Sequence, residues 1–255
     1  MELSMAWQAA VDFWHPNQYG LKKYLVKDGE KHPFALICPG GGYQMVCSFV
    51  EGAPCAKALN ALGYAAFVLH YRCRRRGRYP APQEDAARAL RYILDHADDL
   101  GIDPDGYSLW GSSAGGHLAA SMAAPQGFSA FGLPQPAALI LSYPVVTMGE
   151  LTHLGSRKNL LGSAPPPELV GQLSIETQAT SDFPPTFLWW GDADEVVSPE
   201  NSKMLIHALA QNGVTYEQHE YSGVGHGVGL GRGLPCEDWL NSAVRFWDTQ
   251  RGKLT

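Results

Sequence analysis

A serine spaced between two glycines is the residue of this chain best suited to nucleophilic chemistry. Residues Gly111 to Gly115 read GSSAG, and Ser113, unlike Ser112, has a glycine two positions before and two positions after it. The apolar stretch Tyr107 to Trp110 predicts a buried strand before the serine, and Gly115 to Ala124 predicts a helix after it. On such a strand–turn–helix junction the serine hydroxyl is exposed at the end of the sheet. The pattern therefore predicts Ser113 as a nucleophile.

Three acidic residues follow the predicted strand Pro185 to Trp190 and compete for the role of an orienting acid. A serine hydroxyl needs a base to take its proton, and the base needs an acid to hold it. At a junction of this kind the chain order is nucleophile, acid, base. We favour Asp194, which lies just before Val196, where the loop should turn toward the serine. Asp192 is the alternative, and its ordinary role would be to accept hydrogen bonds from nearby amides in a turn.

The candidate base is His226, which follows the last predicted strand, Thr215 to Tyr221. It lies between two glycines in a glycine-rich loop, which can adopt the backbone conformations that bring an imidazole to the sheet edge. Two other histidines are less suitable. His219 falls within the strand, and His117 follows the serine by four residues, so we expect it to pack inside the helix.

A glycine run after an earlier strand can supply the amide donors that acyl transfer needs. The stretch Pro39 to Tyr43 (PGGGY) follows the predicted strand Phe34 to Cys38 directly. An oxyanion that develops on a carbonyl is stabilised by preorganised N–H groups. We predict that the amides of Gly41, Gly42 and Ala114 form this oxyanion hole. Phosphate binding is the rival interpretation, but neither G-K-[ST] nor G-x-G-x-x-G follows.

Strands and helices alternate along the chain, which predicts an α/β fold with a mostly parallel central sheet and helices on both faces. The stretch Ala65 to Tyr71 is apolar without alternation, as in a strand buried on both faces of a parallel sheet. Further predicted strands are Leu21 to Val26 and Ala138 to Tyr143. Predicted helices are Glu51 to Leu62, the apolar-periodic segment from Pro82 to Gly101, Ser198 to Gly213, and Glu237 to Asp248.

We predict that residues 1–255 form a single domain, because no internal repeat and no Pro/Ser-rich linker divides them. One segment departs from the alternation. Residues 147–182 are irregular and contain Pro165, Pro166 and Pro167. We predict that this segment is a small insertion before the strand that carries the acid; whether it acts as a lid stays open.

Composition narrows the class of function. The 255 residues are 45% hydrophobic and 17% charged, as in a globular protein with a sizeable core. A net charge of −6 argues against general nucleic-acid binding. No stretch reaches the roughly 18 consecutive apolar residues of a membrane helix, so we expect no membrane partner. The start of the chain, Met1 to Met5, has no secretory pattern.

Cysteine and histidine usage argues against disulfides and metal sites. The five cysteines are odd in number and form no Cys-x-x-Cys pair, which indicates reduced thiols and a cytoplasmic location. The nine histidines show no His-Glu-x-x-His or comparable spacing. We expect neither a metal nor a cofactor.

Taken with these motifs, the chain resembles the α/β-hydrolase superfamily. Within it, the chain is similar to small cytosolic esterases related to acetylxylan esterases and to the hormone-sensitive-lipase-like group. Many lipase-like relatives carry histidine at the position of Pro39. Proline at this position is similar to the carbohydrate acetylesterases of the group. The matching segments are Pro39 to Tyr43, Tyr71-Arg72, Gly111 to Leu118, Pro184 to Leu188, Asp194 to Val197 and His226 to Leu230.

The resemblance implies a serine carboxylesterase that removes short acyl groups, acetyl above all, from small-molecule or oligosaccharide esters. It also implies a structural ion pair between Arg72 and Asp85. Two alternatives stay open. One is a prolyl-oligopeptidase-like peptidase, although the chain is too short for the propeller domain of those enzymes. The other is a non-catalytic binding protein on the same fold. The natural acyl group and alcohol, and whether the protein is a homo-oligomer, stay open as well.

Two further features bear on substrate contacts. Tyr43 and Trp190 lie near the expected site and could stack on a sugar, so we predict them as substrate-pocket residues. The run from Arg72 to Arg78 holds five of the eleven arginines. Its ordinary role would be a solvated loop, and contact with an acidic sugar or a partner subunit is the alternative.

Overall fold

The centre of the molecule is a twisted seven-stranded sheet. The computed structural model describes residues 20–252, so Met1 to Met5 lie outside the described part of the chain. Within it the strand order is β1-β3-β2-β4-β5-β6-β7, with every neighbouring pair parallel except β1 and β3. The strands are β1 (Leu21–Tyr24), β2 (His32–Cys38), β3 (Ala65–Leu69), β4 (Ile102–Ser112), β5 (Ala138–Ser142), β6 (Thr186–Gly191) and β7 (Tyr216–Tyr221).

Three of the inner strands, β3, β5 and β6, are buried along their length, which explains their largely apolar sequences. All residues of β3 (AAFVL), β5 (ALILS) and β6 (TFLWWG) are buried. Such strands carry helices on both faces. Strand β4 begins earlier than the sequence predicts, because its first residue, Ile102, already pairs with β2 ahead of an irregularity in the register.

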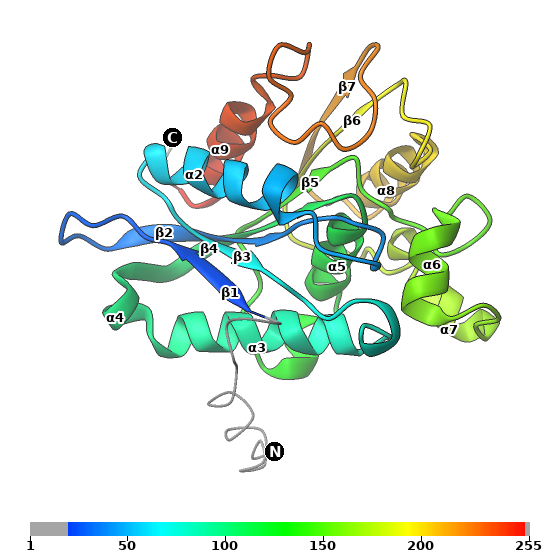
Figure 1. Ribbon diagram of the computed structural model, residues 1–255, viewed down its shortest axis with the longest axis horizontal. Helices are drawn as coiled ribbons and strands as arrows, with labels where there is room; N and C mark the ends of the chain where they lie inside the picture. Colours follow the sequence, from blue (N-terminus) through cyan, green and yellow to red (C-terminus); the bar gives the residue numbers. More distant parts are fainter. Residues whose placement is uncertain (1–19, 253–255) are drawn as a thin grey trace.

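Helices cover both faces of the sheet (Figure 1), as the sequence predicts: α2 and α9 lie over one face, α3 and α5 over the other. Helix α9 shows why it packs there: its buried residues recur at helical spacing and end in the fully buried ring of Trp247. The main helices are α2 (Ala53–Ala61), α3 (Ala81–Asp95), α4 (Ala97–Leu100), α5 (Ser113–Ala123), α8 (Glu200–Gln211) and α9 (Trp239–Gln250).

Two predicted helices differ from the observed ones. The helix predicted to start at Glu51 starts as α2 at Ala53, and a π-helical turn, η1 (Ser48–Gly52), precedes it. The helix predicted to end at Gly101 is divided at His96 into α3 and α4. Gly101 still ends α4 in the left-handed conformation that favours glycine.

Residues 147–182 are more regular than the sequence predicts. They contain α6 (Leu154–Leu161), α7 (Pro167–Gln172) and a 3₁₀ turn, η4 (Ile175–Thr177). The prolines that suggested irregular structure lie at the start of α7, where proline is compatible with a helix because the first amides need no helical acceptor. The segment packs on the body through buried residues such as Leu160 and Ile175.

The Arg72–Asp85 ion pair implied by the resemblance is present. Arg72 Nε lies 2.9 Å from Asp85 Oδ2, and the Arg72 amide donates to the same oxygen at 2.8 Å. Asp85 is almost fully buried at the start of α3. The pair therefore ties the loop after β3 to α3. It has no contact with Ser113 that would give it a chemical role.

Candidate active site

Ser113 lies at the turn between β4 and α5 and has a left-handed backbone, with φ of +53°. This conformation is strained for a residue with a side chain and persists only when its surroundings hold it. The flanking glycines have a steric reason. A Cβ on Gly111 would overlap the Gly115 carbonyl, and a Cβ on Gly115 would overlap the carbonyls of Cys38 and Pro39. The glycine spacing in the sequence therefore reflects the close packing of this turn.

Asp194, His226 and Ser113 form a continuous hydrogen-bonded chain. His226 Nε2 lies 2.8 Å from Ser113 Oγ, and His226 Nδ1 lies 2.6 Å from Asp194 Oδ2. With Nδ1 donating to the carboxylate, Nε2 is left to accept the serine proton. The chain joins the ends of β4, β6 and β7, which meet at one edge of the sheet because the three strands are parallel.

The loop after β6 separates the roles of the two competing acids. Asp194 Oδ1 accepts the amides of Val196 and Val197, each at 2.9 Å, so Oδ2 faces the imidazole. Asp192 instead accepts the Gly223 amide at 2.6 Å and does not contact His226. It braces the loop that carries the histidine, which is the turn-stabilising role expected for an acid in this position.

In the glycine loop after β2, the carbonyls of Gly41 and Gly42 accept hydrogen bonds while their amides stay open. Gly41 and Gly42 have φ of +124° and +64°. The Gly41 carbonyl accepts the Gln44 amide at 3.0 Å, and the Gly42 carbonyl accepts Asn159 Nδ2 at 2.9 Å. Within the described residues, no hydrogen bond occupies the amides of Gly41, Gly42 or Ala114. Such a set of open amides beside a serine can bind the oxygen of a tetrahedral intermediate.

One cavity of about 380 Å³ contains Ser113 and His226. Its lining is mixed in polarity. Cys47, Val50 and Val196 are apolar, and polar side chains come from Gln44, just after the glycine loop, and from the insertion. The full lining is Gly41, Gly42, Gln44, Cys47, Val50, Glu51, Ser113, His153, Gly155, Asn159, Val196, His226 and Gly227. In residues 20–252 no cluster of three or more acidic, cysteine or histidine side chains could hold a metal ion.

Comparison with known proteins assigns the family. The family model described as BD-FAE matches residues 23–209, most of the chain. The chain belongs to the BD-FAE family of α/β-hydrolases. A solved structure of similar fold is the acetyl ester-xyloside bifunctional hydrolase from Caldicellulosiruptor lactoaceticus, with a TM-score of 0.84 and 33% identity over 97% of this chain and 94% of that one.

Two curated relatives of this BD-FAE protein are larger enzymes. The chain is 31% identical to endo-1,4-beta-xylanase B of Butyrivibrio fibrisolvens over 95% of this chain and 41% of that protein. It is 30% identical to the acetylxylan esterase of Xylanibacter ruminicola over 82% of this chain and 44% of that protein. The chain thus spans less than half the length of either relative.

The aromatic residues predicted to contact substrate do not line the cleft. The Tyr43 side chain is fully buried, and its hydroxyl lies 2.8 Å from Nδ1 of His117. The Trp190 side chain does not line the cavity of Ser113; its Nε1 donates to Glu220 on β7 at 3.1 Å. Both predictions were wrong for the same reason, because closeness in sequence to a site does not decide which way a side chain points. His117 packs inside α5 as expected, and burial lowers its pKa to about 4.

Glu51 is a site residue that the sequence analysis missed. Its side chain is buried below the glycine loop, where Oε2 accepts the Gly40 amide at 2.6 Å. Oε1 accepts the Tyr143 hydroxyl at 3.1 Å, and that hydroxyl accepts the Gly229 amide at 3.2 Å. One carboxylate thus joins the glycine loop to the loop that carries His226. In the sequence, an acid near a helix start is ordinary, so nothing local distinguished it.

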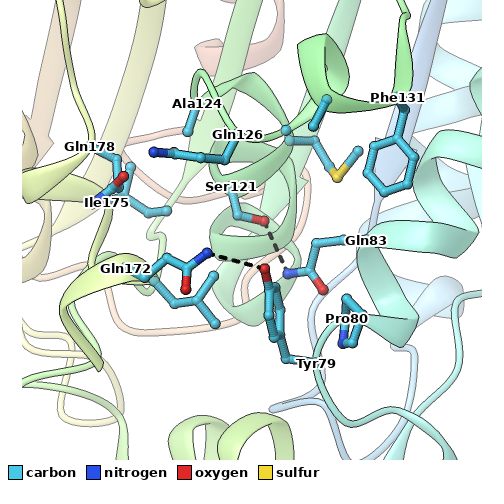
Figure 2. A pocket seen from close by; sticks show the side chains of 14 residues that line it. Tyr79, Pro80, Gln83, Ser121, Ala124, Gln126, Phe131, Gln172, Ile175 and Gln178 are labelled. Carbon is cyan, nitrogen blue, oxygen red and sulfur yellow. Dashed lines mark hydrogen bonds between the residues drawn. The ribbon is translucent and has the colours of Figure 1, made fainter. Parts of the chain in front are cut away.

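A second cavity, of about 210 Å³, lies near the carboxyl end of α5 and shares no lining residue with the cleft. Figure 2 shows its amide groups: Gln83 Nε2 donates to Ser121 Oγ, and Gln172 Nε2 donates to the Tyr79 hydroxyl. Ser121 has no base beside it, since its hydroxyl donates to the Leu118 carbonyl. The acyl-transfer geometry of the described residues therefore belongs to the cleft at Ser113.

Proposed function

We propose that this protein is a serine carboxylesterase that removes short acyl groups, acetyl above all, from carbohydrate esters. The observation that carries the proposal is the hydrogen-bonded chain Asp194–His226–Ser113 beside the open amides of the glycine loop. The names of similar proteins support the choice of ester. They include an acetylxylan esterase and an acetyl ester-xyloside hydrolase.

The proposed reaction has two halves. Ser113 Oγ attacks the ester carbonyl carbon while His226 Nε2 takes its proton. The oxygen anion is held by the amides of Gly41, Gly42 and Ala114. The intermediate then collapses, the carbon–oxygen bond to the alcohol breaks, and His226 gives its proton to the departing alcohol. In the second half a water takes the place of the alcohol and attacks the acyl carbon while His226 takes its proton. The bond between that carbon and Ser113 Oγ then breaks, and His226 gives the proton to Ser113 Oγ, which releases the acid and free Ser113.

The apolar lining of the cleft supports a short acyl group. Cys47 and Val50 line the same cavity as Ser113, and the whole cavity measures about 380 Å³. An apolar wall favours a methyl over a charged group, which agrees with acetyl. The reaction proposed here uses side chains and backbone amides of this chain alone.

The first experiment is Ser113→Ala with 4-nitrophenyl acetate as substrate. We expect release of nitrophenol to fall to the rate of the uncatalysed background, and labelling by a fluorophosphonate probe to disappear. Retained hydrolysis or retained labelling in the folded variant would place the nucleophile elsewhere. Wild-type protein that binds substrate but never turns over would instead favour a non-catalytic binding protein.

The second experiment identifies the ester. Acetylated xylo-, manno- and pectic oligosaccharides are compared with nitrophenyl esters of increasing acyl length. We expect kcat/KM to be highest for acetyl and to fall as methylenes are added. The fall per methylene should be modest, because one methylene is worth only about 1–3 kcal/mol of discrimination. Peptide substrates serve as the test of the peptidase alternative, and we expect no cleavage of them.

The compartment is a further part of the proposal. No helix among residues 20–252 has the length and apolarity to cross a membrane. All five cysteines are free thiols. We propose that the enzyme works in the reducing environment of the cytoplasm, and thiol titration of protein isolated from its own cells should count five reduced thiols. Disulfides in that protein would contradict this proposal.

A further inference from the structure

The polar lining residues of the catalytic cleft have no assigned role. Three neutral polar side chains line the cavity of Ser113: His153 and Asn159 from the insertion, and Gln44 from the glycine loop. None of them belongs to the hydrogen-bonded chain of Asp194, His226 and Ser113. Their hydrogen-bonding groups show what they can bind.

His153 has its free donor on Nε2. The residue immediately precedes α6, and its Nδ1 accepts a hydrogen bond from the Ser156 amide at 3.3 Å and lies 2.9 Å from the Ser156 hydroxyl, which can donate to it as well. A ring nitrogen that accepts carries no hydrogen, so the neutral ring carries its hydrogen on Nε2. Burial lowers the pKa of His153, and the nearby His226 lowers it further, which keeps the ring neutral at pH 7. No residue described in the structure accepts a hydrogen bond from Nε2.

The His153 ring lies next to Gly42 of the glycine loop. A Cβ placed on Gly42 would be 3.6 Å from His153 Cε1, and one on Gly155 would be 3.4 Å from Nε2. The ring edge that carries the donor is thus flanked by backbone without side chains. The donor lies in the same cavity as the amides expected to hold the ester carbonyl. This shared cavity is the basis for assigning the donor to a hydroxyl or ring oxygen next to that ester.

Asn159 and Gln44 complement this donor with acceptors. Asn159 Nδ2 donates to the Gly42 carbonyl, so Asn159 Oδ1 remains available as an acceptor. The Gln44 side chain is exposed and offers both an acceptor and a donor. Glu51, the one carboxylate of the cavity outside the catalytic chain, is already occupied by Gly40 and Tyr143. Donors and acceptors without net charge suit neighbouring hydroxyls of a neutral sugar.

We propose that His153, Asn159 and Gln44 form a subsite for the sugar that leaves as the alcohol, with His153 Nε2 as the main donor to a sugar hydroxyl. In the same proposal the acyl methyl contacts the apolar lining residues Cys47 and Val50. The inference rests on the proposed function for its choice of a sugar ester. Binding energy from such remote hydroxyls positions the ester for attack by Ser113.

The test is His153→Asn, because asparagine is a good helix N-cap and keeps an acceptor for the Ser156 amide while removing the distant N–H donor. We expect kcat/KM for an acetylated xylo-oligosaccharide to fall by about tenfold, the equivalent of one hydrogen bond. Hydrolysis of 4-nitrophenyl acetate, which has no sugar hydroxyls, should be nearly unchanged. The matched control is His207→Asn, which replaces an exposed histidine of α8.

A binding readout separates a subsite from a structural role. Deacetylated xylo-oligosaccharide should inhibit nitrophenyl acetate hydrolysis competitively, and the inhibition constant should rise in His153→Asn by the same factor as the loss of kcat/KM. Equal losses on both esters, or no loss on either, would overturn the subsite. Wild-type protein that hydrolyses nitrophenyl acetate but no acetylated sugar would instead overturn the sugar ester of the proposed function.

Discussion

Replacement of Glu51 by alanine should slow the chemical step while the fold survives. The carboxylate holds the Gly40 amide at 2.6 Å and, through Tyr143, the Gly229 amide of the histidine loop. Without it, the glycine loop loses the contact that fixes the peptide just before the proposed oxyanion donors. Those donors act on charge that develops in the transition state, so their displacement affects kcat rather than substrate binding.

The structure sets the size of the effect. Loss of one oxyanion-hole donor costs roughly 100- to 1000-fold in kcat, and Glu51→Ala should approach that range because the Gly40 peptide, next to the proposed donors, loses the acceptor of its amide. The stability cost is smaller. An orphaned buried amide costs about 1–3 kcal/mol, within the total of about 5–15 kcal/mol available to a domain. The kcat of Glu51→Gln should lie between those of the wild-type protein and Glu51→Ala, since the glutamine carbonyl can still accept the Gly40 amide.

The assay is steady-state hydrolysis of 4-nitrophenyl acetate, with kcat and KM measured separately. Affinity for a trifluoromethyl ketone, which mimics the tetrahedral intermediate, should fall in parallel with kcat/KM. Glu30→Ala, which removes an exposed acid on the β1–β2 turn, is the matched control. The reasoning would be refuted by a folded Glu51→Ala protein that keeps wild-type kcat, or by one whose only change is a higher KM.

Three further predictions concern the acids and a buried histidine. Asp194→Asn should lower kcat by about four orders of magnitude, because an amide does not hold the imidazole in the required tautomer. Asp192→Asn should leave kcat nearly unchanged. If Asp192→Asn instead lowered kcat for 4-nitrophenyl acetate more than Asp194→Asn, the roles of the two acids would be exchanged. Asp85→Asn should lower the free energy of unfolding in urea by about 3 kcal/mol. This is the low end for a broken buried ion pair, because the Glu84 carboxylate still faces Arg72. An unchanged urea midpoint would contradict this. Burial lowers the pKa of His117 from 6.5 to about 4, so the unfolded chain binds its proton more tightly. His117 should therefore cost nothing above pH 6.5 and destabilise the fold by about 3 kcal/mol as pH falls to 4. His117→Gln should remove this part of the acid sensitivity in urea denaturation, and equal acid sensitivity of both proteins would rule the reasoning out.

Local patterns were sufficient for much of the fold. The unbroken apolar run that starts at Ala65 predicts an inner parallel strand. A strand covered on both faces has no side exposed to solvent, so its sequence does not alternate with polar residues. The glycine spacing around Ser113 predicts the strand–turn–helix junction, because close packing of that turn excludes side chains at both positions. The insertion was harder to predict. Its three prolines are compatible both with irregular chain and with the first turn of α7.

The residues proposed for covalent chemistry were therefore determined by the sequence alone. Their identities depend on motifs a few residues long and on the order of those motifs along the chain. Tertiary structure alone decided that Tyr43 turns into the core and that Glu51 supports the glycine loop. It also separated Asp194, which the sequence analysis favoured, from its alternative Asp192. These outcomes depend on contacts between distant segments, such as Glu51 with Tyr143, 92 residues apart. No local pattern encodes which side chains such contacts bring together, because the folding of the sheet places them there.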